Sequence, residues 1–331
     1  MSPSSPHDAN RDLARPHIAF IGAGALASVY GVRLALRSAT VSFVVRSQRV
    51  GDTSPLATEC ISTRERLTLD RPARAAAIPA DCSCVALAVR AENLDATLES
   101  LVRSGPDVPV ISLTPLLPAA LRRLREAVGE RLVVAMPGVV AYADASSTVR
   151  YWLPRVAPTM LDDRFAGNPS VRAVHDALLA AGIPAKFESN VDKMNSATTI
   201  TFLPLVLLLD AAGGTAARAL EAPALLKLAF QAVAECRNAA RFVGEVPAWA
   251  HLLTRFVGPR TIRIGISLGQ RASPESVRFV EQHFGTKTHE QNVLLAREVI
   301  SIGTEYGVKM DAMRRLSDAC EDRVPGGPGH A

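Results

Sequence analysis

The stretch HIAFIGAGALASVYGVRLALR, residues 17–37, decides the fold class of this 331-residue chain. A short apolar run ends at Ile21, the segment GAGALA follows at residues 22–27, and the remainder has the apolar spacing of a helix. Strand, tight turn and helix in this order are typical of a dinucleotide-binding unit, because the small residues permit the turn, admit a pyrophosphate and let the helix pack closely. Free N–H groups at the helix start favour the diphosphate. The stretch therefore predicts phosphate contacts from Gly22, Gly24, Ala25, Leu26 and Ala27.

The second apolar run, TVSFVV at residues 40–45, ends in the tetrapeptide RSQR and not in Asp or Glu. An acid at this point would bind the ribose 2′-hydroxyl of NAD, whereas arginine accommodates a 2′-phosphate. The sequence therefore predicts NADP(H), held by Arg46, Ser47 and Arg49. The alternative, in which these arginines are only solvated on a loop, stays open.

Further apolar runs at residues 83–89, 108–113 and 131–135 alternate with helix-like stretches at 91–102 and 119–128. Alternation of this kind predicts a mostly parallel sheet with helices on both faces. Ligands of such sheets lie beyond the carboxyl ends of the strands, so Arg90 and Thr114 are expected at the rim of the nucleotide site. We expect the turn-rich region from residue 136 to about 160 to complete or flank the sheet.

The periodicity changes in the second half of the chain. Helices are predicted at residues 191–212, 222–243, 248–257, 274–284 and 288–306. The fold class is therefore α/β, a Rossmann doubly wound sheet followed by an all-α domain, with substrate expected in the cleft between them. The expected division is a disordered tail (1–16), an NADP-binding domain (17–187), a helical substrate and dimerisation domain (188–322) and a loose tail (323–331).

Charge, cysteines and hydropathy exclude several classes of protein. The net charge of +5 is modest and the basic residues are scattered, so no nucleic-acid partner is expected. The five cysteines form no CxxC pair and none has His at ligand spacing, which predicts no metal site and a reducing cytoplasm. The apolar segment 197–209 has only 13 residues, which is too short to cross a bilayer, and is expected to be a core helix of a soluble protein.

The segment IAFIGAGALASVYGVRLA, residues 18–35, resembles the GAGAxGSxYGxxL opening of the ketopantoate reductase family. The order of domains and the EYGV segment at residues 305–308 are similar as well, so the resemblance covers most of the chain. It implies NADPH-dependent reduction of a 2-oxo acid to a 2-hydroxy acid, a homodimer, and a helical domain like the C-terminal domain of 6-phosphogluconate dehydrogenases.

The resemblance also implies a helix that carries a lysine, then asparagines four and eight residues later, the last followed by proline. With Pro204 as the anchor, the lysine position falls on Asn195 and the asparagine positions fall on Thr199 and Leu203. Lys193 lies two residues earlier, which turns its side chain by about 200° from Asn195 around a helix.

With Lys193 as the anchor, the asparagine positions become Ala197 and Thr201, so neither register restores the family pattern. Ketone reduction needs a proton donor or cation near the oxygen on which negative charge develops. Lys193 is the candidate donor, the alternative being an ordinary solvated lysine in the first helical turn. Asn195 and Thr199 are candidates for hydrogen bonds to substrate.

Other family positions differ in this chain. The family's lysine after the third main strand becomes Arg90, and its asparagine after the next strand becomes Thr114. Counting back from residues 306–308, the family's substrate-binding glutamate falls on Gln291, and a shift of one residue gives Glu290, which we take as the candidate.

The leading hypothesis is an NADP-dependent reductase with a changed substrate, such as a bulkier 2-oxo acid, a related ketone or an imine. The alternatives are a true 2-dehydropantoate 2-reductase that uses Lys193, and a non-catalytic NADP-binding sensor or partner protein. An opine-type dehydrogenase is a weaker alternative, because no His/Asp pair supports it. His283 and His289 are interpreted as exposed histidines.

Overall fold

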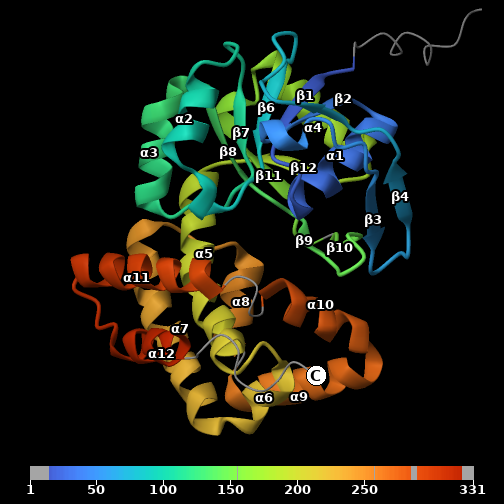
Figure 1. The fold of residues 1–331 in the computed structure, drawn as a ribbon. Helices are drawn as coiled ribbons and strands as arrows, with labels where there is room; N and C mark the ends of the chain where they lie inside the picture. The colour runs from blue at the N-terminus through green and yellow to red at the C-terminus, as the bar shows by residue number, and fades with distance from the viewer. Residues whose placement is uncertain (1–14, 155, 257, 285–288, 323–331) are drawn as a thin grey trace, which may run out of the picture.

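The computed structural model describes residues 15–154, 156–256, 258–284 and 289–322. A lobe built on β-sheets is followed along the chain by a lobe of helices (Figure 1). This confirms the predicted fold class, a Rossmann sheet followed by an all-α domain. The two tails expected from the sequence lie largely outside the described residues.

The main sheet has eight strands in the order β12-β11-β8-β7-β6-β1-β2-β5. Its central strands are parallel, and β11 runs antiparallel to β8. Helices cover both faces of such a sheet, so its central strands are continuous apolar runs, which is why β1, β2, β6, β7 and β8 were predictable. The strands are β1 (His17–Ile21), β2 (Thr40–Val44), β5 (Ala73–Ala75), β6 (Cys84–Leu87), β7 (Val110–Ser112), β8 (Leu132–Met136), β11 (Thr159–Asp162) and β12 (Ala185–Glu188).

Two apolar clusters pack the main sheet from opposite faces. On one face, α1 (Ala25–Arg37) and α4 (Pro169–Ala180) bury side chains against the sheet. On the other face lie α2 (Ala96–Arg103) and α3 (Pro118–Val128). Helix α1 packs closely on β2 because Gly31 has no side chain: a Cβ there would lie 2.5 Å from Cζ of Phe43.

A second sheet of four strands, in the order β4-β3-β10-β9, stands beside α1. The sequence predicted that the region after residue 136 would complete or flank the main sheet. In the structure β9 and β10 belong to the second sheet, whereas β11 joins the main one. The strands are β3 (Leu56–Cys60), β4 (Arg66–Leu69), β9 (Val140–Ala143) and β10 (Val149–Trp152).

The helical lobe is built around α5 (Val191–Ala211), which packs against α7 (Pro223–Val243), α11 (His289–Glu305) and α12 (Asp311–Glu321). All the helices predicted in this half are present, whereas α6, α9 and α12 were not predicted. The remaining helices are α6 (Ala216–Glu221), α8 (Ala248–Phe256), α9 (Pro259–Ala272) and α10 (Pro274–Phe284).

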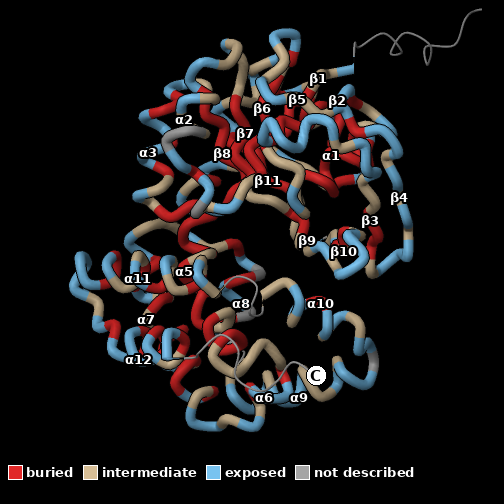
Figure 2. The backbone as a smooth tube through the Cα atoms, viewed as in Figure 1, coloured by how far each residue is buried: buried red, intermediate tan, exposed pale blue. Residues whose placement is uncertain are grey.

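Helix α5 has the length and composition of a membrane span, yet 61% of its most apolar window is buried inside the protein. Figure 2 shows this burial along α5 and in the strands of the main sheet. The prediction of a core helix agrees with this packing, but the reason given for it was wrong. The apolar segment of 13 residues belongs to a helix of 21 residues, close to the predicted range 191–212, so its burial and not its length identifies it as a core helix.

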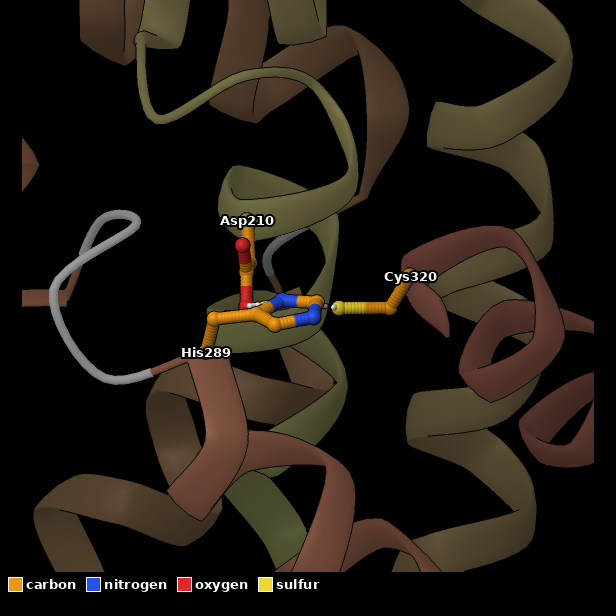
Figure 3. A group of neighbouring side chains, drawn as sticks. All are labelled: Asp210, His289 and Cys320. Atoms are coloured by element: carbon orange, nitrogen blue, oxygen red, sulfur yellow. Dashed lines mark hydrogen bonds and ion pairs between the residues drawn. The ribbon is translucent and has the colours of Figure 1, made fainter. Parts of the chain in front are cut away.

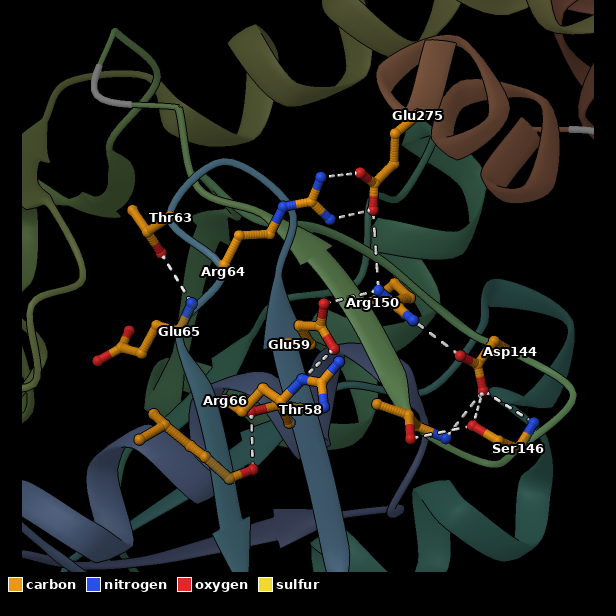
Figure 4. A network of polar contacts seen from close by, with 12 residues as sticks. Thr58, Glu59, Thr63, Arg64, Glu65, Arg66, Asp144, Ser146, Arg150 and Glu275 are labelled. Atoms are coloured by element: carbon orange, nitrogen blue, oxygen red, sulfur yellow. Dashed lines mark hydrogen bonds and ion pairs between the residues drawn. The ribbon is translucent and has the colours of Figure 1, made fainter. Parts of the chain in front are cut away.

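Polar contacts join the two lobes at the N-terminus of α10 (Figure 4). The guanidinium of Arg64, in the turn between β3 and β4, forms a two-point ion pair with Glu275. Arg150 on β10 lies 3.8 Å from the same carboxylate and also binds Glu59 and Asp144. The second sheet therefore presents a basic edge to the helical lobe.

Apolar and aromatic contacts continue this junction along α10. The ring of Phe279, which is buried, lies 5.3 Å from that of Tyr142 on β9. Nδ1 of His283 lies 2.8 Å from the carbonyl oxygen of Ala141, and burial lowers the pKa of this imidazole. The neutral ring therefore donates this hydrogen bond, and α10 is docked on the second sheet.

Candidate nucleotide and substrate site

The glycine turn lies at the carboxyl end of β1. Gly22 has φ +91°, a left-handed conformation that glycine adopts without strain. Its N–H donates to the carbonyl oxygen of Val44 at 2.8 Å, and a Cβ here would lie 3.2 Å from Cγ1 of Val89. The turn is therefore fixed between the ends of β2 and β6.

Gly24 is the N-cap of α1, and its backbone is extended. No side chain caps the helix, its first turn holds no acidic residue, and nothing lies within 4 Å of the point where a Cβ of Gly24 would stand. The N–H groups of Ala25, Leu26 and Ala27 have no partners within the helix, as in every first helical turn. Together with the positive end of the helix dipole, these donors form a site suited to an anion.

The arginines that follow β2 lie on the surface, and β2 is the neighbour of β1, the strand that ends in the glycine turn. Arg46, Ser47 and Arg49 are all exposed, and the last two belong to a short 3-10 helix, Ser47–Arg49. Arg49 reaches Asp52 at 3.4 Å. Hydrogen bonds from Ser54, with help from Arg74, lower the pKa of Asp52 to about 2, so this carboxylate stays charged beside Arg49. Arg46 is the guanidinium with no acidic neighbour among the described residues.

The predicted rim residues lie at the next strand ends. The Thr114 side chain is buried, and its hydroxyl donates to the carbonyl oxygen of Val89 at 2.7 Å. Val89 is the residue that packs against Gly22, so Thr114 supports the glycine turn from beneath. Arg90 follows directly and is exposed. The structure thus brings Thr114 and Arg90 to the same edge of the sheet as the turn.

The first turns of α5 pack against this edge. The side-chain amide of Asn195 donates to the carbonyl oxygen of Ala135 on β8 at 3.3 Å. The hydroxyl of Ser196 donates to the carbonyl oxygen of Leu116 at 2.8 Å. Ser196 was not among the residues predicted from the sequence. Thr199 lies one turn further and donates to the carbonyl oxygen of Asn195. Asn195 and Thr199 therefore share one face of the helix, as predicted from their spacing.

Lys193 lies apart from this pair. It is exposed, and its backbone packs against Gly244, where a Cβ would stand 2.7 Å from the Lys193 carbonyl oxygen. Within the described ranges its ammonium group has no hydrogen-bond or ion-pair partner. The two-residue offset turns it about 200° from Asn195. The structure does not bring Lys193 together with Asn195 and Thr199.

The acidic candidate Glu290 is exposed in the first turn of α11. Two turns later, Glu298 accepts a hydrogen bond from the N–H of Ala119, at the start of α3, at 3.3 Å. Partial burial raises the pKa of Glu298. This carboxyl group therefore links the helical lobe to the nucleotide-binding lobe. No motif surrounds it in the sequence, and only its place in the fold distinguishes it.

No family model matches the chain, and no curated protein matches its sequence. Solved structures match its shape. A 2-dehydropantoate 2-reductase from Geobacter metallireducens GS-15 is 16% identical with a TM-score of 0.67, and 92% of this chain and 99% of that one are covered. A PanE/ApbA family ketopantoate reductase from Ralstonia eutropha JMP134 is 17% identical with a TM-score of 0.67, over 92% and 97% of the two chains.

A D-mandelate dehydrogenase in complex with NADH is 15% identical, with a TM-score of 0.60 over 92% of this chain and 97% of that one. Identities this low establish the fold and leave the reaction open. Both lobes are included in the match, since nearly the whole of each chain is covered. The chain therefore has the fold of the ketopantoate reductases, with the Rossmann and helical lobes in the same order.

Proposed function

We propose that this protein binds NADP(H) and reduces a small carbonyl compound, a 2-oxo acid or a related ketone or imine. One observation carries the proposal: the uncapped N-terminus of α1, with open space at Gly24, lies beside a strand that ends in exposed Arg46, Ser47 and Arg49. The likeness in fold to the ketopantoate reductases, and to a D-mandelate dehydrogenase solved with NADH, supports a reductase of this class.

Each part of the cofactor has a group of suitable chemistry. The diphosphate would accept hydrogen bonds from the first N–H groups of α1. A 2′-phosphate would bind the guanidinium of Arg46, with Arg49 partly engaged by Asp52. Arg90 and Thr114 are the candidates toward the nicotinamide end. When bound, NADPH supplies a hydride to the carbonyl carbon.

The substrate side of the proposal rests on α5. Asn195 and Thr199 share the face that packs on the carboxyl edge of the sheet, so they are the proposed hydrogen-bonding groups for the substrate. Lys193 remains the proposed proton donor and Glu290 a proposed substrate contact. Because Asn195 stands where the family has a lysine, we infer that the substrate differs from ketopantoate. We further propose that the protein is a soluble cytoplasmic homodimer, as the resemblance implies.

The test is NADPH oxidation against a panel of 2-oxo acids, ketones and imines that includes ketopantoate. Lys193→Ala is compared with Lys227→Ala, which removes another exposed lysine, on α7. Turnover of a compound other than ketopantoate, lost in Lys193→Ala and kept in Lys227→Ala, supports the full proposal. Turnover kept in both variants supports the reductase and removes Lys193 as the proton donor.

Two other outcomes would replace the proposal. Ketopantoate turnover that is lost in Lys193→Ala, with NADPH binding intact, identifies a true 2-dehydropantoate 2-reductase. Binding of NADPH without turnover of any compound identifies a non-catalytic sensor or partner protein.

A further inference from the structure

Three side chains that are distant in sequence converge inside the helical lobe. Asp210 lies at the C-terminal end of α5, His289 is the first residue of α11, and Cys320 is in the last turn of α12. Nδ1 of His289 lies 3.1 Å from Oδ2 of Asp210 and 3.8 Å from Sγ of Cys320. Figure 3 shows the carboxylate and the thiol on two sides of the imidazole. All three ligand atoms lie within 4.8 Å of one another.

The two separations from His289 are close to the edges of a tetrahedral metal site. With zinc bonds of about 2.1 Å to nitrogen and oxygen and about 2.3 Å to sulfur, the N–O edge is about 3.4 Å and the N–S edge about 3.6 Å. The observed 3.1 Å and 3.8 Å depart from these values by only a few tenths of an ångström. The third pair, Oδ2 of Asp210 and Sγ of Cys320, lies within 4.8 Å, and an edge of about 3.6 Å there would place one ion at bonding distance from all three side chains.

Other chemistry explains the cluster less well. In a nucleophilic cysteine relay, the carboxylate and the sulfur contact different nitrogens of the imidazole. Here the carboxylate and the sulfur both contact Nδ1 of His289, whereas a relay needs them on different nitrogens. A single proton on Nδ1 can form a well-aligned hydrogen bond with the carboxylate or with the sulfur, but not with both. A cation satisfies all three groups together.

Burial and charge favour a divalent ion. The side chain of Asp210 is 0% exposed and Cys320 is fully buried, so a carboxylate and a thiolate would lie close together away from water. One divalent cation neutralises both. The amide of Asn292 donates to Oδ2 of Asp210 at 3.0 Å, which orients the carboxylate as an outer-shell partner does. His289 is 23% exposed, which gives water a path to a fourth position.

We propose that Asp210, His289 and Cys320 bind one zinc ion, which ties the first turn of α11 to the ends of α5 and α12. Thiolate, imidazole and carboxylate together suit zinc better than calcium or magnesium, which prefer oxygen ligands alone. This departs from the expectation of no metal, which rested on spacing along the chain. The ligands come from three helices, so no local spacing contains them.

The test is metal analysis of untagged protein from zinc-supplemented culture, dialysed against metal-free buffer. The expected content is about one zinc per chain in the wild type. His289→Ala and Cys320→Ser should each retain less than about a tenth of that amount. Cys236→Ser is the matched control, since it removes another buried thiol of the same lobe and should keep the metal. Asn292→Ala should weaken zinc affinity by about 10- to 100-fold, as loss of an outer-shell partner does.

Cobalt substitution supplies a second readout. The cobalt form should show a thiolate-to-metal charge-transfer band that Cys320→Ser removes and Cys236→Ser preserves. The proposal is overturned if the dialysed wild-type protein contains no zinc and also binds none when free zinc is restored to micromolar concentration. The three side chains would then be only a hydrogen-bonded cluster. Zinc retained by both His289→Ala and Cys320→Ser overturns it as well. If Cys320→Ser fails to fold, the zinc content of His289→Ala tests the proposal instead. The His289 side chain is partly exposed at the start of α11, so its removal should leave the fold intact.

Discussion

Replacing Gly24 with aspartate should raise the stability of the protein and abolish its binding of NADPH. Gly24 has φ −75° and ψ −176°, the backbone conformation of an N-cap, and its Cβ would meet no atom within 4 Å. An aspartate therefore fits without strain and accepts hydrogen bonds from the first N–H groups of α1. These are the groups to which we assign the cofactor phosphates, so stability and binding should change in opposite directions.

The magnitudes follow from the same groups. Aspartate in place of glycine at an N-cap adds a few tenths of a kcal/mol, about 0.3. A negative charge at the helix start adds about 0.3–1 kcal/mol. Together these raise the melting temperature by about 1–4 °C. Loss of two charge-assisted hydrogen bonds to phosphate, each worth about 1.5–3 kcal/mol, weakens NADPH binding by a factor of about 100 or more.

The assay pairs thermal melts without ligand and calorimetric titrations with NADPH on the wild type and Gly24→Asp. Gly24→Asn is the matched control, because it supplies a similar cap without the charge and should lose less affinity. A Gly24→Asp protein that melts at the higher temperature and still binds NADPH within about threefold of the wild type would refute this reasoning, since such a change is under 1 kcal/mol.

Three further predictions concern stability. Gly138→Ala should destabilise the protein by about 1–3 kcal/mol or more in urea melts, since its Cβ would lie 2.3 Å from the carbonyl oxygen of Ala157. Gly51→Ala, whose Cβ would meet no atom within 4 Å, should be nearly neutral, and equal effects of the two substitutions would contradict this. Burial raises the pKa of Glu298, so the folded protein loses stability as the pH rises and this carboxyl group ionises. Glu298→Gln should therefore be more stable than the wild type at pH 7. This gain should vanish below about pH 4.3, where the carboxyl group is protonated in both the folded and the unfolded chain. Burial lowers the pKa of His283, so below about pH 6.5 the unfolded chain binds a proton at this imidazole more readily than the folded protein does. The free energy of unfolding should therefore decrease as the pH falls below about 6.5. A His283→Gln variant whose free energy of unfolding decreases equally steeply with falling pH would count against this.

Much of the fold was predictable because its elements have strong local signals. The glycine turn and the central strands of the main sheet are continuous apolar segments with clear breaks, and the long helices have regular apolar spacing. The second sheet was missed because β4, β9 and β10 alternate more buried and more exposed positions and so lack the continuous apolar runs of the central main-sheet strands. Helix α9 was missed because it presents Ile264 and Leu268 to solvent, at 59% and 57% exposure, and has no clear core stripe.

The candidate site was predictable in part for the same reason. Positions fixed by strand ends, such as Gly22 and Thr114, follow from local sequence. Contacts between separate helices do not, because they depend on how the helices pack. The hydrogen bond from Ala119 to Glu298 spans 179 residues, and the Cys320 sulfur meets an imidazole 31 residues away. The sequence alone contains no local signal for either contact.

The most direct test of a phosphate-bearing cofactor at the glycine turn is calorimetric titration of the wild-type protein with NADPH and with NADH. We expect NADPH to bind at least about 10-fold more tightly, because one charged contact of Arg46 to the 2′-phosphate is worth about 1.5–3 kcal/mol. Equal affinities would remove the assigned role of Arg46. No heat with either nucleotide, together with an unchanged melting temperature, would contradict the proposed function as a whole.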